Sequence, residues 1–438
     1  MRPRRGGVPP ILRDPWLDRE GETLTELTPT ARRSASSTLL FTRAVYAFNW
    51  YNVGAVLPLV GSALAATTLE LGIVLGAFLA GAGLFQIPAG MAALRWGNRN
   101  VTLASLGLMG AFCVASAFSP NWIVLALLRF GAGAGAAFFF APAIGLVTSY
   151  YPAGTRGPII GLYNSGFSLG SGIGLFVGAF IGAEFGWAWA LAVGGLALLG
   201  SGAVAPFLIP RTDPLRPPRP IRALWTASRP VLRSRALWAL ALSFIGLWSA
   251  FYVAAQYFVQ YAHEVHPGWS LAVAAGLPTI MIAVEILGGP FGGWLAERGG
   301  DMRWLLAGFG AAAAVAIMLL PFGTFPELVA LFALLGLLDG IVWAVLYLLP
   351  TYLPETEGEG LALGLGLLNT INIFGGSALA VAFAYVATYA NFTVAWLFAG
   401  VLALVPLPLL LFVTGHQRNR TTAGSTGPTI GARPDPRA

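Results

Sequence analysis

Four ionisable side chains lie inside long apolar stretches of this 438-residue chain, and these residues could do chemistry there. Arg43 and Arg129 could hold an anion, whereas Asp339 and Glu285 could take up and release a proton. A charge inside a membrane span is costly, so each of these groups requires a partner or a role. Asp339, in the stretch LLGLLDGIVWAV, has no polar neighbour, which makes it the first candidate for proton coupling.

Three of these four residues have a second interpretation. Arg43 lies about one turn into the first predicted helix, so its stem could extend back to the membrane interface. Arg129 lies about 10 Å into its helix, and could bind an anionic substrate or pair with an acid. Glu285 could take part in coupling or could hydrogen-bond the backbone of a neighbouring helix.

Neutral polar residues recur on several apolar stretches and could bind a substrate without using charge. In the stretch 236–262, polar residues recur at three- and four-residue spacing, which places them on one helix face. Together such faces predict a cavity lined by amides and aromatic rings, although each residue alone could instead hydrogen-bond a neighbouring helix. The residues are Ser249, Tyr252, Gln256 and Gln260 with Trp248 beside them, and Asn49, Asn52, Asn164, Ser168, Asn369 and Asn372 elsewhere.

Composition places the chain in a membrane. Hydrophobic residues make up 57% of it and charged residues only 10%, far from the balance of a soluble domain.

The 25 basic residues are all Arg, and a P-loop needs a Lys, so ATP-driven pumping by this chain is excluded. The Arg residues are spread over turns and tails, which does not suit nucleic-acid binding. The lone Cys113 is interpreted as a core residue, and HEVH at 263–266 lacks the spacing and third ligand of a metal site.

Apolar runs of about 20 residues predict an all-α integral membrane protein with twelve transmembrane helices in two six-helix bundles. We expect a disordered cytoplasmic tail over 1–37, bundles over 38–210 and 236–415, an extended basic linker over 211–235, and a second disordered cytoplasmic tail over 416–438. The predicted helices are 38–62, 71–93, 101–119, 122–150, 157–183 and 186–209, then 236–262, 270–294, 303–321, 326–352, 359–387 and 391–414.

The distribution of Arg residues predicts the orientation. All except Arg43 and Arg129 lie in the two tails, the linker and the even-numbered turns. Because Arg stays on the cytoplasmic side of short loops, both termini are expected in the cytoplasm.

The two halves share a turn motif. GMAALRWGNRN, over 90–100, and GWLAERGGDMR, over 293–303, place Gly, Arg and Gly at the same offsets. SYYP, over 149–152, is likewise echoed by TYLP, over 351–354. A six-plus-six repeat of this kind is typical of transporters that rock two bundles about a central site.

The repeated turn resembles the signature turn of the major facilitator superfamily, Gly-x-Leu-Ala-Asp-Arg-x-Gly-Arg-Arg. Leu94 replaces the acid in the first copy. The resemblance implies an inner gate in which Glu297 and Arg298 take part, and a cavity lined by helices 1, 4, 7 and 10. LLRFGAGAGAA in helix 4 and the Gly spacing in helix 5 also resemble patterns of that family. The matching turn residues are Gly90, Arg95, Gly97 and Arg99, and Gly293, Glu297, Arg298 and Gly300.

These features predict a secondary active transporter of the cell membrane that moves a small molecule by alternating access, coupled to a proton or another ion. Two buried Arg residues suit uptake of an organic anion, whereas the Gly pattern and aromatic cavity suit efflux of an amphipathic compound. A receptor or scaffold on the same fold is the alternative, while no intramembrane nucleophile or metal cluster suggests an enzyme. We expect a monomer without a cofactor.

Overall fold

The computed structural model describes residues 27–151, 156–211, 228–298, 301–356 and 359–413, and its regular elements there are helical. The first half contains α1 (Pro29–Ala55), α2 (Leu57–Leu64), α3 (Thr68–Leu84), α4 (Gln86–Trp96), α5 (Asn98–Ser116), α6 (Trp122–Ser149), α7 (Arg156–Phe185) and α8 (Trp187–Leu208). The second half contains α10 (Arg235–Val265), α11 (Leu271–Glu297), α12 (Met302–Leu319), α13 (Phe325–Leu348), α14 (Glu359–Tyr389) and α15 (Phe392–Leu404). Short 3-10 helices follow three of these: η3 (Leu320–Phe322), η4 (Leu349–Tyr352) with η5 (Pro354–Thr356), and η6 (Leu407–Phe412).

The helices are apolar along their length and are started by polar caps. Thr67 and Thr324 form capping boxes with the Glu three residues later, at the starts of α3 and α13. Asn121 and Asn391 cap α6 and α15 through their side-chain oxygens. Polar residues thus mark where one helix ends and the next begins.

Nine helices in the described part of the chain are long and apolar enough to cross a membrane. The pair α2 and α3 qualifies only as one broken segment, and the 119° bend between them makes it a reversal of direction. Each of the twelve predicted segments overlaps a helix of the structure. The chain is therefore a multi-pass membrane protein, and the count of twelve crossings stays a prediction.

One predicted boundary and one predicted conformation are wrong. Within the tail predicted for 1–37, a helix already begins at Pro29, because Thr28 caps it and Ser36 hydrogen-bonds the Tyr151 hydroxyl at 2.9 Å. Within the linker predicted as extended, residues 228–233 are helical. The remaining residues of both tails and of the linker lie almost entirely outside the described residues.

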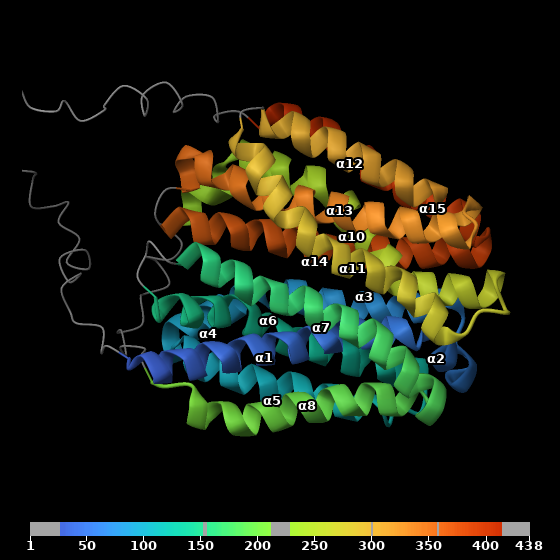
Figure 1. Ribbon diagram of the computed structural model, residues 1–438, viewed down its shortest axis with the longest axis horizontal. Coiled ribbons are helices and arrows are strands. Elements are labelled where there is room, and N and C mark those ends of the chain that lie inside the picture. Colours follow the sequence, from blue (N-terminus) through green and yellow to red (C-terminus); the bar gives the residue numbers. More distant parts are fainter. Residues whose placement is uncertain (1–26, 152–155, 212–227, 299–300, 357–358, 414–438) are drawn as a thin grey trace, which may run out of the picture.

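The two halves have the same internal arrangement. In the first half α1 packs on α7 and α8, and α6 on α3 and α5; in the second, α10 packs on α14 and α15, and α13 on α11 and α12. The halves meet through α3 against α14 and α7 against α11, which are equivalent pairs (Figure 1). The contact pattern is therefore that of two related bundles about an approximate two-fold axis.

The two ends of the molecule differ in how the halves meet. We call the end where α1 begins and α15 leads into η6 the terminal end, and the opposite end, with the α2–α3 and α14–α15 turns, the loop end (Figure 1). Toward the loop end, glycines bring the halves together. A Cβ on Gly72 would lie 2.3 Å from Ala384 Cβ, and one on Gly54 would lie 2.0 Å from Gln256 Oε1.

Toward the terminal end α7 and α11 are less closely packed. Asn164 of α7 is exposed, although Ser168, one turn nearer the loop end, hydrogen-bonds Glu285 of α11. No atom lies within 4 Å of a Cβ built on Gly289 or Gly293 of α11. The halves are thus joined at the loop end and more open at the terminal end.

Replacement of Gly54 by Val should favour an arrangement in which α1 and α10 lie further apart. The added side chain would overlap Gln256, and overpacking costs about 1–3 kcal/mol, which corresponds to a population shift of about 5–150-fold. Spin labels on Ala63 and His263, in a variant without Cys113, would report the change as longer distances. Gly107→Val is the control, because a Cβ there has no atom within 4 Å. Unchanged distances between the spin labels in Gly54→Val would contradict the role of Gly54 in bringing α1 and α10 together.

Candidate functional site

Arg43 lies in the middle of α1, inside a cage of aromatic rings. Its side chain is 4% exposed, and its guanidinium carbon lies 5.1 Å from the ring centre of Tyr46, 4.9 Å from Phe140, 5.3 Å from Tyr163 and 4.6 Å from Phe167. Ring faces attract a cation but accept few hydrogen bonds. Accordingly, Nε and one terminal nitrogen have no hydrogen-bond partner among the described residues.

The burial of Arg43 among these rings argues against the interpretation that its stem extends to the membrane interface. Because α1 begins at Pro29, Arg43 lies about 21 Å along the helix rather than one turn into it. The guanidinium therefore remains among the rings.

Arg129 is buried in the first half at the level of Asn49. It is 1% exposed and donates to the Asn49 carbonyl oxygen at 3.1 Å and toward Cys113 Sγ at 3.8 Å, with its guanidinium 4.4 Å from the Phe78 ring centre. Its Nε has no partner among the described residues. Within that part of the chain, no carboxylate pairs with Arg43 or Arg129.

The two candidate coupling carboxylates belong to the second half; Asp339 is buried and Glu285 is half-buried. Glu285 of α11 accepts a hydrogen bond from Ser168 of α7 at 3.4 Å, so it lies on the seam between the halves. Asp339 of α13 interacts electrostatically with Glu285 and with the indole of Trp343, and its Oδ1 lacks a partner among the described residues. Tyr51 of α1 lies within electrostatic range of both acids. The acids thus face the first half across the seam.

One aromatic residue of the second half, Tyr347, interacts with Arg43. Tyr347 of α13 interacts electrostatically with Arg43 and donates a hydrogen bond to Asn369 of α14. Trp343 stacks on Tyr347 with ring centres 5.1 Å apart. Tyr347 is thus the residue of the second half within electrostatic range of Arg43, and it belongs to a group with Trp343 and Asn369.

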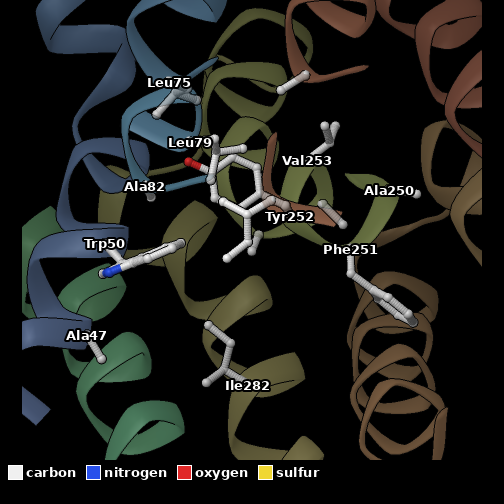
Figure 2. Packing of buried hydrophobic residues seen from close by; sticks show 14 of the residues in the cluster. Ala47, Trp50, Leu75, Leu79, Ala82, Ala250, Phe251, Tyr252, Val253 and Ile282 are labelled. Carbon is white, nitrogen blue, oxygen red and sulfur yellow. The ribbon is translucent and has the colours of Figure 1, made fainter. Parts of the chain in front are cut away.

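The polar face of α10 contacts the first half, as Figure 2 shows for Tyr252. Tyr252 stacks on Trp248 at 5.6 Å, and its ring points toward Leu79 of α3, beside Trp50 (Figure 2). Gln256, one turn further along, donates to the Trp50 carbonyl oxygen at 2.8 Å. These residues hold the halves together in this arrangement.

Several predicted amides make contacts within one half. Asn49 donates to the Gly194 carbonyl oxygen at 2.9 Å and Asn52 to the Ala190 carbonyl oxygen at 3.0 Å, so both join α1 to α8. Asn372 is buried, and its Oδ1 has no partner in the described part of the chain. A substrate role for these amides stays a prediction.

Comparison with known proteins identifies the family. The sequence model of the Major Facilitator Superfamily matches residues 39–365, which is most of the chain. The chain belongs to that superfamily. It is therefore a transporter of small molecules and not an enzyme.

Relatives and solved structures agree with this assignment. The chain is 26% identical to the niacin transporter NiaP of Acinetobacter baylyi over 350 residues, 72% of this chain and 78% of that one. It is 31% identical to monocarboxylate transporter 11 of Homo sapiens over 234 residues, 51% of this chain and about half (48%) of that one. A crystal structure of a bacterial homolog of the human lysosomal transporter Spinster, in an inward-facing and occupied conformation, has the same fold, with a TM-score of 0.69 and 16% identity over 88% of this chain and 96% of that one.

In this superfamily member the predicted gate turns lie at the terminal end. Gly97 has φ +81°, a conformation that favours glycine, and ends α4. Arg298 lies 4.1 Å above its own helix neighbour Trp294, and Arg95 lies above Trp96. No atom lies within 4 Å of a Cβ on Gly90, and Gly300 lies outside the described residues. The gate function of these turns, Glu297 included, stays a prediction.

The repeat has a second pair of residues, Arg99 and Arg303, of which the sequence analysis singled out only Arg99. Arg99 donates to the carbonyl oxygens of Ile209 and Pro206 at 2.7 Å each, and so holds the end of α8. Arg303 donates to the carbonyl oxygen of Val413 at 3.1 Å, after η6, and pairs with Asp301. Arg99 and Arg303 are as far apart in the sequence as Ile209 and Val413. This equal separation was the sequence signal that could have identified Arg303 as the counterpart of Arg99.

The aromatic cage was also missed as a group. Phe140, Tyr163 and Phe167 come from α6 and α7, far from Arg43 in the sequence. No spacing rule connects them, so only the packing of α1 on α7 reveals the cage.

Replacement of Arg99 by Ala should destabilise the protein. Two carbonyl oxygens would lose a charged donor, and hydrogen bonds to charged groups are worth about 1.5–3 kcal/mol each. Thermal unfolding in detergent would show the loss, with a smaller loss in Arg303→Ala, whose side chain is more exposed. Arg95→Ala is the matched control, because its side chain only covers Trp96. Equal melting of Arg99→Ala and Arg95→Ala would contradict the role of Arg99.

Proposed function

We propose that this chain takes up a small organic anion together with a proton across the cell membrane, by alternating access between its two halves. The observation that carries the proposal is the Arg43 guanidinium, which is buried with unused donors and without a carboxylate partner in the described residues. A charge at such a position is costly unless a ligand uses it. A substrate carboxylate would supply the missing acceptor.

The surroundings of Arg43 define the kind of anion that fits. A carboxylate can accept two parallel hydrogen bonds from a guanidinium. Stacked Trp343 and Tyr347 on the facing half offer a surface for a planar ring. Small aromatic and other planar monocarboxylates are therefore the preferred substrates in this proposal.

The relatives support the same class. NiaP is named as a transporter of niacin, which is an aromatic carboxylic acid. Monocarboxylate transporter 11 is named for monocarboxylates. The identities of 26% and 31% leave the substrate to be tested.

Coupling is assigned to Glu285 and Asp339. Glu285 contacts Ser168 across the seam, so its charge affects how closely α7 and α11 pack. A protonated carboxyl can remain in an apolar seam, whereas an ionised one favours contact with water. Proton binding would thus favour closure of this seam, and proton release would favour opening.

The orientation proposed here places the terminal end in the cytoplasm. The arginine distribution supports it, because the two tails, the linker and the gate turns carry most of the chain's Arg. The present arrangement would then be closed toward the outside. A monomer contains both halves and can perform the cycle alone.

Replacement of Arg43 by Gln should strongly reduce uptake of [14C]benzoate into proteoliposomes. Loss of a charge-assisted hydrogen bond of about 1.5–3 kcal/mol predicts a rise in KM of about tenfold or more. Arg43→Lys keeps the charge but not the paired donors, and should retain part of the activity. Leu162→Ala is a control on an exposed residue of α7 that belongs to none of the predicted sites. Wild-type transport of lipophilic cations but of no organic acid would contradict the proposal.

Replacement of Glu285 by Gln should abolish accumulation driven by a pH gradient. The amide resembles the protonated acid, so benzoate exchange between equal pools should persist while an inward proton gradient no longer increases uptake. If both acids carry the proton, Asp339→Asn should also retain exchange and lose the response to the pH gradient. If a single acid carries it, only one of the two variants should behave in this way. Wild-type uptake that ignores the pH gradient would contradict coupling to protons.

A further inference from the structure

The first half contains a continuous row of aromatic rings that connects its two buried guanidinium groups. Arg43 contacts the Tyr46 ring, which lies 5.8 Å from the ring of Trp50, and Trp50 lies 4.8 Å from Phe78. Phe78 lies 4.4 Å from the guanidinium of Arg129. The five residues come from α1, α3 and α6, so packing alone brings them together.

Unused hydrogen-bond donors occur at three points along this row. Over the described residues, two nitrogens of Arg43, Nε1 of Trp50 and Nε of Arg129 have no hydrogen-bond partner of normal distance and angle, although the Tyr46 hydroxyl interacts with Arg43 and Trp50. Buried polar groups in native proteins normally have partners. Unpartnered donors beside two cations suit an anion, although the nearby amides of Asn49 and Gln256 also leave a buried oxygen without a partner.

Arg129 and Arg43 lie at different depths. Arg129 donates to the carbonyl oxygen of Asn49, which lies six residues beyond Arg43 on α1, or about 9 Å along the helix toward the loop end. Arg43 therefore lies on the side of the terminal end, and Arg129 on the side of the loop end.

Tyr252 of the second half covers the Arg129 side of the row in this arrangement. Its ring lies 6.3 Å from Tyr51 and points toward α3 beside Trp50 (Figure 2). Its buried hydroxyl has no hydrogen-bond partner in the described residues and interacts electrostatically with Arg129. Separation of the halves at the loop end would withdraw Tyr252, because α10 belongs to the second half.

We infer that Arg129 forms a second anion site, which receives the carboxylate of the substrate when the halves separate at the loop end. The substrate then passes along Trp50 and Tyr46 to Arg43, which holds it when the terminal end is open. This inference rests on the proposed anion transport and adds a separate entry site to it. If Arg129 only stabilised the fold of the first half, its replacement would not change the affinity for substrate.

Two measurements on Arg129→Gln separate these roles. Benzoate binding to the detergent-solubilised protein, followed by tryptophan fluorescence, should reflect the arrangement described here and depend on Arg43. Arg129→Gln should leave this affinity almost unchanged, and yet raise the KM for benzoate uptake from the loop-end side about tenfold or more. Arg129→Lys should recover part of the KM, because it restores the charge.

The native Cys113 gives a test without any substitution at Arg129. It is the sole cysteine and lies 3.8 Å from Arg129. In intact cells, an impermeant anionic methanethiosulfonate added outside should modify Cys113 faster than its cationic counterpart does, and benzoate should slow the reaction. Tyr252→Ala should accelerate modification, whereas Phe251→Ala, which removes a ring pointing away from α3, should not (Figure 2).

The outcomes distinguish the inference from the proposed function. An unchanged uptake KM in Arg129→Gln, a Cys113 that never reacts during turnover, or modification that benzoate does not slow would each overturn the second site. Equal loss of detergent binding in Arg43→Gln and Arg129→Gln would also overturn it, because a single site would then contain both residues. Absence of any benzoate transport by the wild-type protein, with Cys113 still protected by benzoate, would overturn the proposed function but not the site.

Discussion

A guanidinium inside a membrane protein must be stabilised by something other than bulk water, and this requirement shapes the first half of the molecule. Arg43 is surrounded by four aromatic rings, and Arg129 by one ring, a backbone carbonyl oxygen and a thiol. Quadrupoles and dipoles reduce the cost of each charge without neutralising it. The helices α1, α3, α6 and α7 must pack closely to provide these groups, so the fold of this half and the anion binding proposed for it would have one physical origin.

The second half supplies the opposite charges. Glu285 and Asp339 are separated from the buried cations by the seam between the halves, rather than paired with them. Direct ion pairs would satisfy both partners and leave nothing for a ligand or a proton to change. Because the cations and the acids belong to different halves, their electrostatic interaction depends on how the halves are placed. A mechanism of alternating access requires such a dependence.

The sequence predicted the helices well, because long apolar runs between polar caps have few other structures available in a membrane. It failed at the start of α1, since PTARRSASS over 29–37 is polar and gives no hydropathy signal, although Thr28 and Pro29 form a standard helix start. Because of that one boundary, the sequence analysis placed Arg43 about one turn into its helix. The buried charged residues were identifiable from the sequence, whereas their ring neighbours depend on contacts between distant helices. Arg303 could have been found by extending the repeat beyond the glycines to Arg99 and Ile209.

The close approach of α3 and α14 makes the closed loop end depend on residue size. A Cβ on Gly72 would meet the Ala384 side chain and the Tyr257 hydroxyl, and one on Gly76 would meet the Val381 side chain. Small residues at such positions let two helices come close together. A larger residue at either glycine would therefore hold α3 and α14 apart, whichever substrate the protein carries.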